Sequence, residues 1–267
     1  MVAILSNQRS AILDAVRRMY TEVAIECNRE FHFPTGRKAC EFVGYPAMQL
    51  ETLPKTAVES FAGVGYPFAA QVIRPGDVVL DVGSGSGTDA LIAARLVGPS
   101  GRVIGLDLTE AMRDKLRVNA GIAKAGNLEI LAGNAESIPL PDASVDVVTT
   151  NGVINLVPDK TRAIREIARV LRPGGRLQMA DIVVKSLPSE ACRANPELWA
   201  ECIVGATSEE TYLTGLDEVG LRNLEVLSRS DYFAGSSSAE TRKVAESFGA
   251  HAIVMRAVKG ETGDGRR

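Results

Sequence analysis

The sequence predicts an α/β fold, in which a doubly wound, mostly parallel seven-stranded sheet carries helices on both faces. From about Arg74 onward, short runs rich in β-branched residues alternate with longer stretches whose apolar residues recur every three or four positions. The first of these runs leads directly into a loop with glycine at every second position. The composition, 45% hydrophobic and 24% charged over 267 residues, is that of a folded globular chain.

Five runs predict the strands of the parallel part of the sheet. They lie at residues 78–82, 103–106, 128–131, 145–149 and 176–184. Each is short and dominated by aliphatic side chains, which is typical of strands that are buried on both faces.

Helices are expected between these strands, at residues 89–96, 109–125 and 159–171, because their apolar side chains return to one face that can pack on the sheet. Pro173 and the two glycines after it cannot continue the last of these helices. We therefore expect the chain to turn there into the fifth strand.

The last third of the chain has a helical pattern at residues 208–219, followed by strand candidates at 224–227 and 252–258. A Gly-Ser-Ser-Ser loop at 235–238 lies between the two strand candidates. We expect these two strands to form a closing pair at one edge of the sheet.

Residues 1–73 are expected to form an N-terminal cap. A helix fits residues 4–24, whereas glycine and proline break the rest of the cap into irregular segments. The main domain then spans residues 74–260, with an insertion at about 185–207 after the fifth strand, and 261–267 form a polar tail. We expect the cap and the insertion to roof a pocket together.

The charge balance indicates a small-molecule partner. Thirty Lys and Arg residues against 33 Asp and Glu residues give a net charge of -3, so the chain lacks the basic surface expected for nucleic acid or an anionic membrane. No run reaches the ~18 apolar residues of a membrane span, and the N-terminus becomes polar too early for a signal peptide. The expected compartment is the cytoplasm, and no pattern predicts an oligomeric state.

The cysteines and histidines predict no metal site and no disulfide framework. The chain has four cysteines, none in a C-x-x-C pair, and only two histidines. We expect free thiols at these positions, which are Cys27, Cys40, Cys192 and Cys202.

The glycine loop favours a cationic nucleoside ligand. Gly83, Gly85 and Gly87 let a ligand approach the backbone closely, and Asp107 at the end of the second predicted strand can accept hydrogen bonds from both hydroxyls of a ribose. The spacing G-x-G-x-G differs from the dinucleotide fingerprint G-x-G-x-x-G, and Asp81 stands at the mouth of the loop. No Lys or Arg lies between residues 78 and 91, so a phosphate would meet carboxylates instead of cations.

S-adenosylmethionine fits this pattern, because its ammonium and sulfonium are positive and its adenosine supplies the ribose diol. The chain resembles the class I S-adenosylmethionine-dependent methyltransferases in four motifs, with residues 79–87 as the first motif, 105–108 as the ribose motif, 133–136 after the third strand and 171–175 as the post-motif turn. The resemblance implies that Asp107 binds the ribose and that Leu108 and Met112 flank the adenine. The cofactor-binding set that it implies is Asp81, Gly83, Ser84, Gly85, Gly87, Asp107, Leu108, Met112, Asn134, Ala135, Glu136 and Asn151.

Within this class, residues 61–67, 150–160 and 199–206 resemble the arsenite methyltransferase branch, which holds trivalent arsenic between cysteine thiolates. Cys202 matches one arsenic-binding cysteine of that family. Val64 and Gly152 stand where two further cysteines are expected. We therefore expect a relative of that branch that methylates another small acceptor.

Candidate residues for the chemistry and for the acceptor lie in the cap and the insertion. Methyl transfer from a sulfonium is an in-line displacement that depends mainly on holding the two partners close, so a general base is optional. The catalytic candidates are Cys202 and His32, and the candidates for acceptor binding are Tyr20, Arg37, Tyr66, Asn155 and Trp199.

Three alternatives stay open at this point. The first is an arsenite methyltransferase that uses Cys202 together with cysteines of the cap. The second is a protein that binds S-adenosylmethionine without catalysis. A nicotinamide-dependent oxidoreductase is the third, and the glycine spacing and Asp81 disfavour it.

Overall fold

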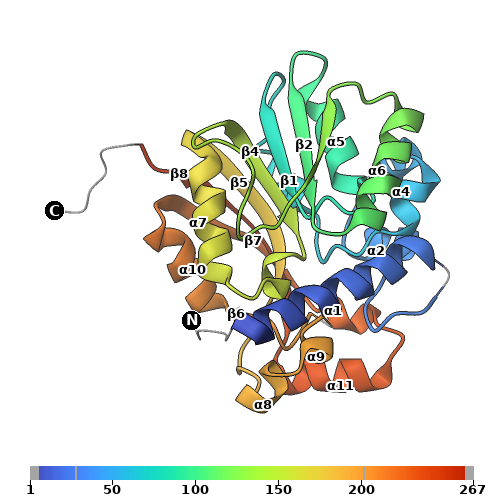
Figure 1. The fold of residues 1–267 in the computed structure, drawn as a ribbon, viewed down its shortest axis with the longest axis vertical. Coiled ribbons are helices and arrows are strands. Elements are labelled where there is room, and N and C mark those ends of the chain that lie inside the picture. Colours follow the sequence, from blue (N-terminus) through green and yellow to red (C-terminus); the bar gives the residue numbers. More distant parts are fainter. Residues whose placement is uncertain (1–5, 28, 201, 262–267) are drawn as a thin grey trace.

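The structure is a computed structural model that describes residues 6–27, 29–200 and 202–261. Its centre is a sheet in the order β3-β2-β1-β4-β5-β8-β7, with a short strand β6 paired to β5 (Figure 1). The expected α/β fold and its mostly parallel sheet are confirmed. The strands are β1 (Val78–Val82), β2 (Arg102–Asp107), β3 (Leu128–Ala132), β4 (Val145–Asn151), β5 (Leu171–Val184), β6 (Thr207–Ser208), β7 (Leu221–Ser230) and β8 (His251–Lys259).

The five strands from β3 to β5 run parallel, β8 pairs antiparallel with β5, and β7 pairs antiparallel with β8 and so runs in the same direction as the five. The expected closing pair is therefore present. The strand β6 has only two residues, which is too short for a periodic pattern to predict it.

Helices cover both faces of the sheet, because alternate strand residues point to opposite sides. On one face, Val79 and Val103 pack with α5 (Thr88–Val97) and α6 (Glu110–Ala123). On the other face, residues such as Leu80 and Ile104 belong to the core under α7 (Lys160–Val170) and α10 (Glu209–Glu218), which Figure 1 shows on the opposite side of the sheet.

The chain before β1 is more helical than expected. Besides α1 (Ser6–Ile25), it forms α2 (Gly36–Phe42), α3 (Ala47–Glu51), α4 (Lys55–Glu59) and the 3₁₀ turn η1 (Pro67–Ala70). Prolines precede α3 and α4, so the residues that break the pattern in the sequence also start the next helix.

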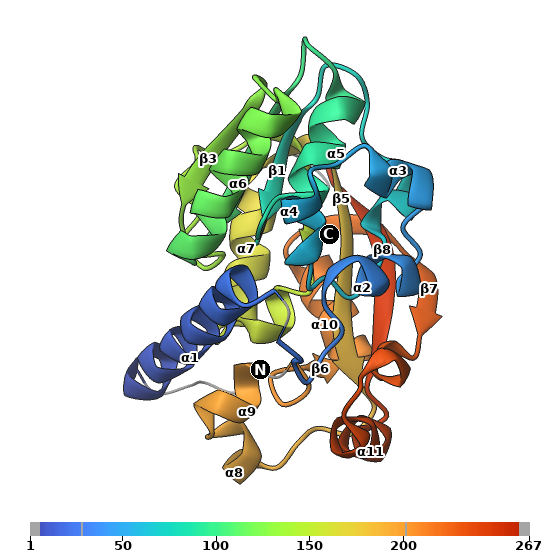
Figure 2. The same ribbon diagram turned by 90° about the vertical axis from the view of Figure 1, so that its right-hand side faces the viewer.

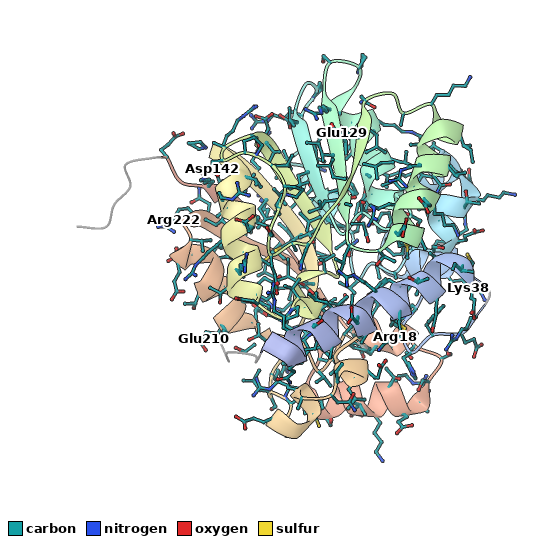
Figure 3. The ribbon with its side chains drawn as sticks, viewed as in Figure 1. Arg18, Lys38, Glu129, Asp142, Glu210 and Arg222 are labelled. Carbon is teal, nitrogen blue, oxygen red and sulfur yellow. The ribbon has the colours of Figure 1, made fainter. Side chains whose placement is uncertain are left out.

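The helix α1 lies across the lower ends of the strands in Figure 1, and α9 (Pro196–Ala200) of the insertion lies beside it in both ribbon views (Figure 2). Arg18, which Figure 3 labels on α1, is ion-paired with Glu197 at 2.6 Å. Cap and insertion are thus in contact. The insertion also contains α8 (Glu190–Arg193).

One expectation about the later chain is wrong. Pro173 lies inside β5, which begins at Leu171, and the pairing with β4 shifts register between Val145 and Val147 to accommodate the extra residues. The region after the serine-rich loop, for which no element was expected, forms α11 (Ala239–Phe248), whose N-cap Ser238 accepts a hydrogen bond from the Thr241 N–H.

Two 3₁₀ turns, η2 (Ile154–Leu156) and η3 (Tyr232–Gly235), complete the fold. Within the described ranges, no helix has the length and apolar character needed to cross a membrane. The start of the expected 4–24 helix and nearly all of the 261–267 tail lie outside the described residues.

Candidate functional site

A pocket that opens to solvent lies where β1, β2, β3 and β4 end, and α1 roofs it. Ligands bind at this edge in open parallel sheets. The lining residues are Leu13, Val16, Tyr20, Ser60, Phe61, Ala62, Gly63, Val82, Gly83, Ser84, Gly85, Ser86, Thr88, Asp89, Leu106, Asp107, Leu108, Thr109, Met112, Gly133, Asn134, Ala135, Asn151, Gly152, Val153, Leu156 and Val157.

The glycine loop requires glycine for two reasons. Gly83 and Gly87 have φ angles of +75° and +102°, which other residues rarely adopt. A Cβ atom on Gly83 would stand 2.3 Å from Val153 Cγ2, and one on Gly87 would stand 2.2 Å from Leu116 Cδ1. The loop therefore keeps its backbone open to the pocket. Gly87 itself is outside the lining.

The Asp107 carboxylate is fixed by backbone donors. The N–H of Gly85 donates to Oδ2 and the N–H of Thr109 donates to Oδ1, both at 2.8 Å. Burial raises the pKa of Asp107, and these two hydrogen bonds act in the opposite direction. Each oxygen keeps a second lone pair, so the carboxylate can still accept from a vicinal diol in the pocket.

Two further aspartates lie near this end of the site, of which Asp89 lines the pocket and Asp81 does not. Asp81 is 1% exposed, and its Oδ2 has no hydrogen-bond partner in the described part of the chain. Burial, together with the charges of Asp89 and Asp107, raises the pKa of Asp81 well above its usual value, which favours its neutral form. The carboxylates available to a ligand in the pocket are therefore those of Asp89 and Asp107.

Around Asn134, the loop after β3 reaches the pocket. Asn134 and Ala135 line it, and Asn134 Oδ1 accepts a hydrogen bond from the Glu136 N–H at 3.0 Å. Glu136 is outside the lining. Its carboxylate is fully buried, is ion-paired with Arg9 of α1 and accepts from the Asp159 N–H at 2.7 Å, so it ties the roof to this loop.

The lining residues that α1, the segment after α4 and residues 152–157 contribute carry no charge, and we call this set the apolar end. They are Leu13, Val16, Tyr20, Phe61, Ala62, Gly152, Val153, Leu156 and Val157.

Tyr20 brings a hydroxyl to the apolar end. Its ring stacks on Phe33 with the centroids 6.1 Å apart, and its hydroxyl oxygen lies 3.9 Å from Cys202 Sγ. Burial and the nearby Cys202 raise the pKa of Tyr20 well above its usual value, so the hydroxyl is neutral. Cys202 is 2% exposed and stands behind Tyr20, outside the lining.

Asn155 and Trp199 do not line the pocket either. The Asn155 Nδ2 group donates to the Cys202 carbonyl at 2.9 Å, and Trp199 Nε1 donates to the Leu156 carbonyl at 2.9 Å. Both side chains therefore attach the insertion to the η2 turn, whose residue Leu156 lines the apolar end.

The remaining candidates are the catalytic candidate His32 and the acceptor candidates Arg37 and Tyr66. His32 is exposed, and its carbonyl accepts from the Ser236 hydroxyl at 2.6 Å. Arg37 is exposed and ion-paired with Glu41 at 2.8 Å. The Tyr66 hydroxyl donates to Gln49 Oε1 at 3.1 Å. None of the three lines the pocket.

Sequence reasoning missed the apolar residues that α1 and the η2 turn contribute, such as Leu13, Val16 and Leu156, and it left Asp89 out of the site. The helical pattern of α1 was the available signal, but the pattern does not show which part of the molecule the apolar face of this helix contacts. Asp89 stands two residues after the glycine loop, and that spacing could have pointed to it.

The positions where two thiols were missing in the sequence lie together. A Cβ atom on Gly152 would stand 3.1 Å from Val64 Cγ1, so these positions share one apolar contact. The cap thiol of Cys27 lies elsewhere, 2.9 Å from the Lys115 ammonium. Among the described residues, no group of three His, Cys, Asp or Glu residues could hold a metal ion.

The methyltransferase domain family matches residues 73–222. An arsenite methyltransferase from Halobacterium salinarum is 36% identical over 197 residues, which are 74% of this chain and 50% of that protein. A ubiquinone/menaquinone biosynthesis C-methyltransferase from Vibrio campbellii is 45% identical over 108 residues, covering 39% of this chain and 40% of that protein. This chain thus spans about half the length of the curated relatives it matches.

Among solved structures, an arsenic(III) S-adenosylmethionine methyltransferase from Chlamydomonas reinhardtii is similar, with a TM-score of 0.60 and 29% identity over 86% of this chain and 75% of that chain. The family match covers more than half of the sequence, from just before β1 into β7. Both observations agree with the strand order and with the glycine loop described above. The chain therefore belongs to the methyltransferase domain family, and it is close in sequence to arsenite methyltransferases.

Proposed function

We propose that the chain is an S-adenosylmethionine-dependent methyltransferase whose acceptor is a small, uncharged organic molecule with an apolar body. The observation that carries this proposal is a single pocket whose lining combines the glycine loop and the Asp89 and Asp107 carboxylates with the uncharged residues of the apolar end. A cofactor and an acceptor can therefore lie in contact there.

The residues at the acidic end fit S-adenosylmethionine. The pocket-lining Asp89 favours a positively charged amino-acid group. The Asp107 carboxylate, held by two backbone N–H groups, suits the ribose diol. When bound, this cofactor supplies an electrophilic methyl group on a sulfonium sulfur.

The apolar end suits a neutral acceptor. Of the described lining residues, none is Lys, Arg or His, so an anionic acceptor would lose its hydration without gaining a partner. Tyr20 offers a neutral hydroxyl for one hydrogen bond. Walls of this kind hold the acceptor atom in line with the methyl group, which is the main requirement of this displacement.

In the transfer itself, a lone pair of the acceptor forms the new bond to carbon. The carbon–sulfur bond breaks, and its electron pair stays on sulfur. A proton on the acceptor atom then leaves to solvent. No charged group of the chain is needed for this balance, which agrees with the uncharged lining of the apolar end.

Arsenite as the acceptor has less support. Val64 and Gly152 form a carbon contact at the positions of two expected thiols, and Cys202 lies behind Tyr20. The named relatives include arsenic methyltransferases and a C-methyltransferase, so membership of the family does not identify the acceptor. The cytoplasmic compartment stays a prediction from the sequence.

The test is conversion of S-adenosylmethionine to S-adenosylhomocysteine by the purified chain. Benzyl mercaptan and 4-(mercaptomethyl)benzoate form a matched neutral and anionic pair of acceptors, and arsenite with a thiol reductant is the third. We expect turnover with the neutral thiol, at least tenfold less with the anionic one, and no stimulation by arsenite. Arsenite-dependent turnover would contradict the acceptor class, and cofactor binding without turnover on any acceptor would favour a binding protein.

A further inference from the structure

Three side chains from distant parts of the sequence meet behind the glycine loop. Tyr45 lies between α2 and α3, Asp89 is in the first turn of α5, and Asn151 ends β4. The Tyr45 hydroxyl donates to Asp89 Oδ1, and Asn151 Nδ2 donates to Asp89 Oδ2 at 3.0 Å. Both carboxylate oxygens are thus held from the protein side, while Asp89 also lines the pocket.

The Asn151 side chain also holds the turn at Gly63–Gly65. Its Oδ1 accepts from the N–H of Val64 at 2.8 Å and from the N–H of Gly65 at 3.2 Å, and its Nδ2 lies 2.9 Å from the Gly65 carbonyl oxygen. A Cβ atom on Gly63 would stand 2.5 Å from Nδ2, so the turn fits closely around the amide. The polar atoms of this amide are therefore engaged with the protein, although Asn151 was expected to bind the cofactor.

The charge on Asp89 depends on these donors. Burial raises the pKa of Asp89 to about 6, and the hydrogen bonds from Tyr45 and Asn151 lower it. Asp81 and Cys40 lie near Asp89. The charge of Asp89 raises the pKa of the Asp81 carboxyl and the pKa of the Cys40 thiol. Because these neighbours are acidic groups that cannot stabilise a negative charge, the two hydrogen bonds are what favours the ionised form.

We propose that Tyr45 and Asn151 are positioning residues that aim the Asp89 carboxylate at the cationic amino-acid group of the cofactor and tie it to the Gly63–Gly65 turn. This inference rests on the proposed function, since it assumes a ligand with a positive charge at the acidic end. It predicts that the affinity for such a ligand depends on the Tyr45 hydroxyl, although that hydroxyl does not line the pocket.

The chain provides a matched control. Tyr212 also donates from a buried hydroxyl to a buried carboxylate, Asp181 Oδ2, at 2.9 Å. Burial raises the pKa of Asp181 to about 6, as it does for Asp89. Neither Tyr212 nor Asp181 lines the pocket. Tyr45→Phe and Tyr212→Phe therefore remove the same kind of bond inside and outside the site.

The experiment is calorimetric titration of the full chain with S-adenosylhomocysteine between pH 5.5 and 8, with thermal unfolding of each variant to show that it is folded. We expect Tyr45→Phe to weaken binding about tenfold at pH 7, as loss of a hydrogen bond to a charged group does. The pH below which affinity falls should also move upward, because the Asp89 carboxyl would keep its proton to higher pH. Tyr212→Phe should bind as the wild type does.

A second variant separates positioning from general damage. Asp89→Asn removes the charge, so adding Tyr45→Phe to it should weaken binding no further. Equal affinity of wild type and Tyr45→Phe, an equal loss in Tyr212→Phe, or independent losses in the double variant would each overturn the inference alone. If the wild-type chain did not bind S-adenosylhomocysteine at all, the proposed function would fall and this inference with it.

Discussion

Val64 and Gly152 lie against each other, with Val64 Cγ1 3.1 Å from where a Cβ atom of residue 152 would stand. The contact joins the turn after α4 to the end of β4 and belongs to the apolar end through Gly152. Gly152 has a φ angle of +71°, which any other residue would adopt only with strain. The backbone at this point therefore favours glycine over a thiol-bearing residue.

Cys202→Ala should leave turnover of a neutral organic acceptor within about threefold of wild type, because Cys202 stands outside the lining and losing a weak thiol contact changes little. The rate of S-adenosylhomocysteine formation measures this, with Cys27→Ala as a control distant from the apolar end. Complete loss of turnover in Cys202→Ala alone would instead indicate a thiol mechanism.

Tyr20→Phe should weaken acceptor binding and leave cofactor affinity unchanged. The ring still stacks on Phe33, while the only hydroxyl that α1 brings to the lining is lost. We expect KM for the neutral thiol to rise about fivefold, as for a lost neutral hydrogen bond. Steady-state kinetics and calorimetry with S-adenosylhomocysteine distinguish the two effects. A loss confined to cofactor affinity would place Tyr20 at the acidic end instead.

Two Gly→Ala changes should have opposite effects on stability. Gly63→Ala places a methyl group 2.5 Å from Asn151 Nδ2 and should cost about 1–3 kcal/mol in free energy of unfolding. Gly121→Ala lies in α6 with open space around the new methyl group and should add about 0.5–1 kcal/mol. Urea denaturation of both variants gives the comparison. A neutral Gly63→Ala would mean that the turn does not fit tightly around Asn151.

Lys160→Met should flatten the pH dependence of stability above neutral pH. Lys160 is 6% exposed, and burial lowers its pKa to about 7. Between about pH 7 and the ordinary lysine pKa of about 10.4, the unfolded chain holds a proton that the folded chain has lost, so stability rises with pH.

In the wild type, Lys160 should make the unfolding free energy rise by up to about 1.4 kcal/mol per pH unit. The Lys160→Met variant should lack this contribution. Other buried groups, such as Asp89 and Asp181 with pKa values of about 6, also contribute to the pH dependence, so the informative quantity is the difference in unfolding free energy between the two proteins from pH 7 to 8.5. A constant difference across that range would show that Lys160 stays charged in the folded chain.

Much of the fold was predictable because its signals are local. The periodic runs from β1 onward and the glycine loop each depend on neighbours within a few residues, and they gave the sheet and the acidic end. The interruption at Pro173 was also a local signal, but the sheet absorbs it as an irregularity in β5 instead of a turn. The missed α11 has an ordinary N-cap in Ser238, which a closer search for capping residues would have found.

The contacts that hold the site together were not predictable in the same way, because they join distant segments. The Tyr45 hydroxyl donates a hydrogen bond to Asp89, and the Asn151 side chain is hydrogen-bonded to the Gly63–Gly65 turn, yet no periodic pattern links these positions. Glu136 was expected to contact the cofactor from its place in a motif, whereas its carboxylate is paired with Arg9 of the roof. Such pairings depend on tertiary packing between distant segments, and no local pattern in the sequence predicts them.

The most direct test of the central claim is calorimetric titration of the wild-type chain and Asp107→Asn with S-adenosylhomocysteine. We expect one binding site per chain and about 10- to 100-fold weaker binding by Asp107→Asn, because an amide cannot accept from both backbone donors and a diol. Asp114→Asn, on the exposed surface of α6, should bind as wild type does. No binding by the wild type, or equal binding by Asp107→Asn, would contradict the assignment of this pocket.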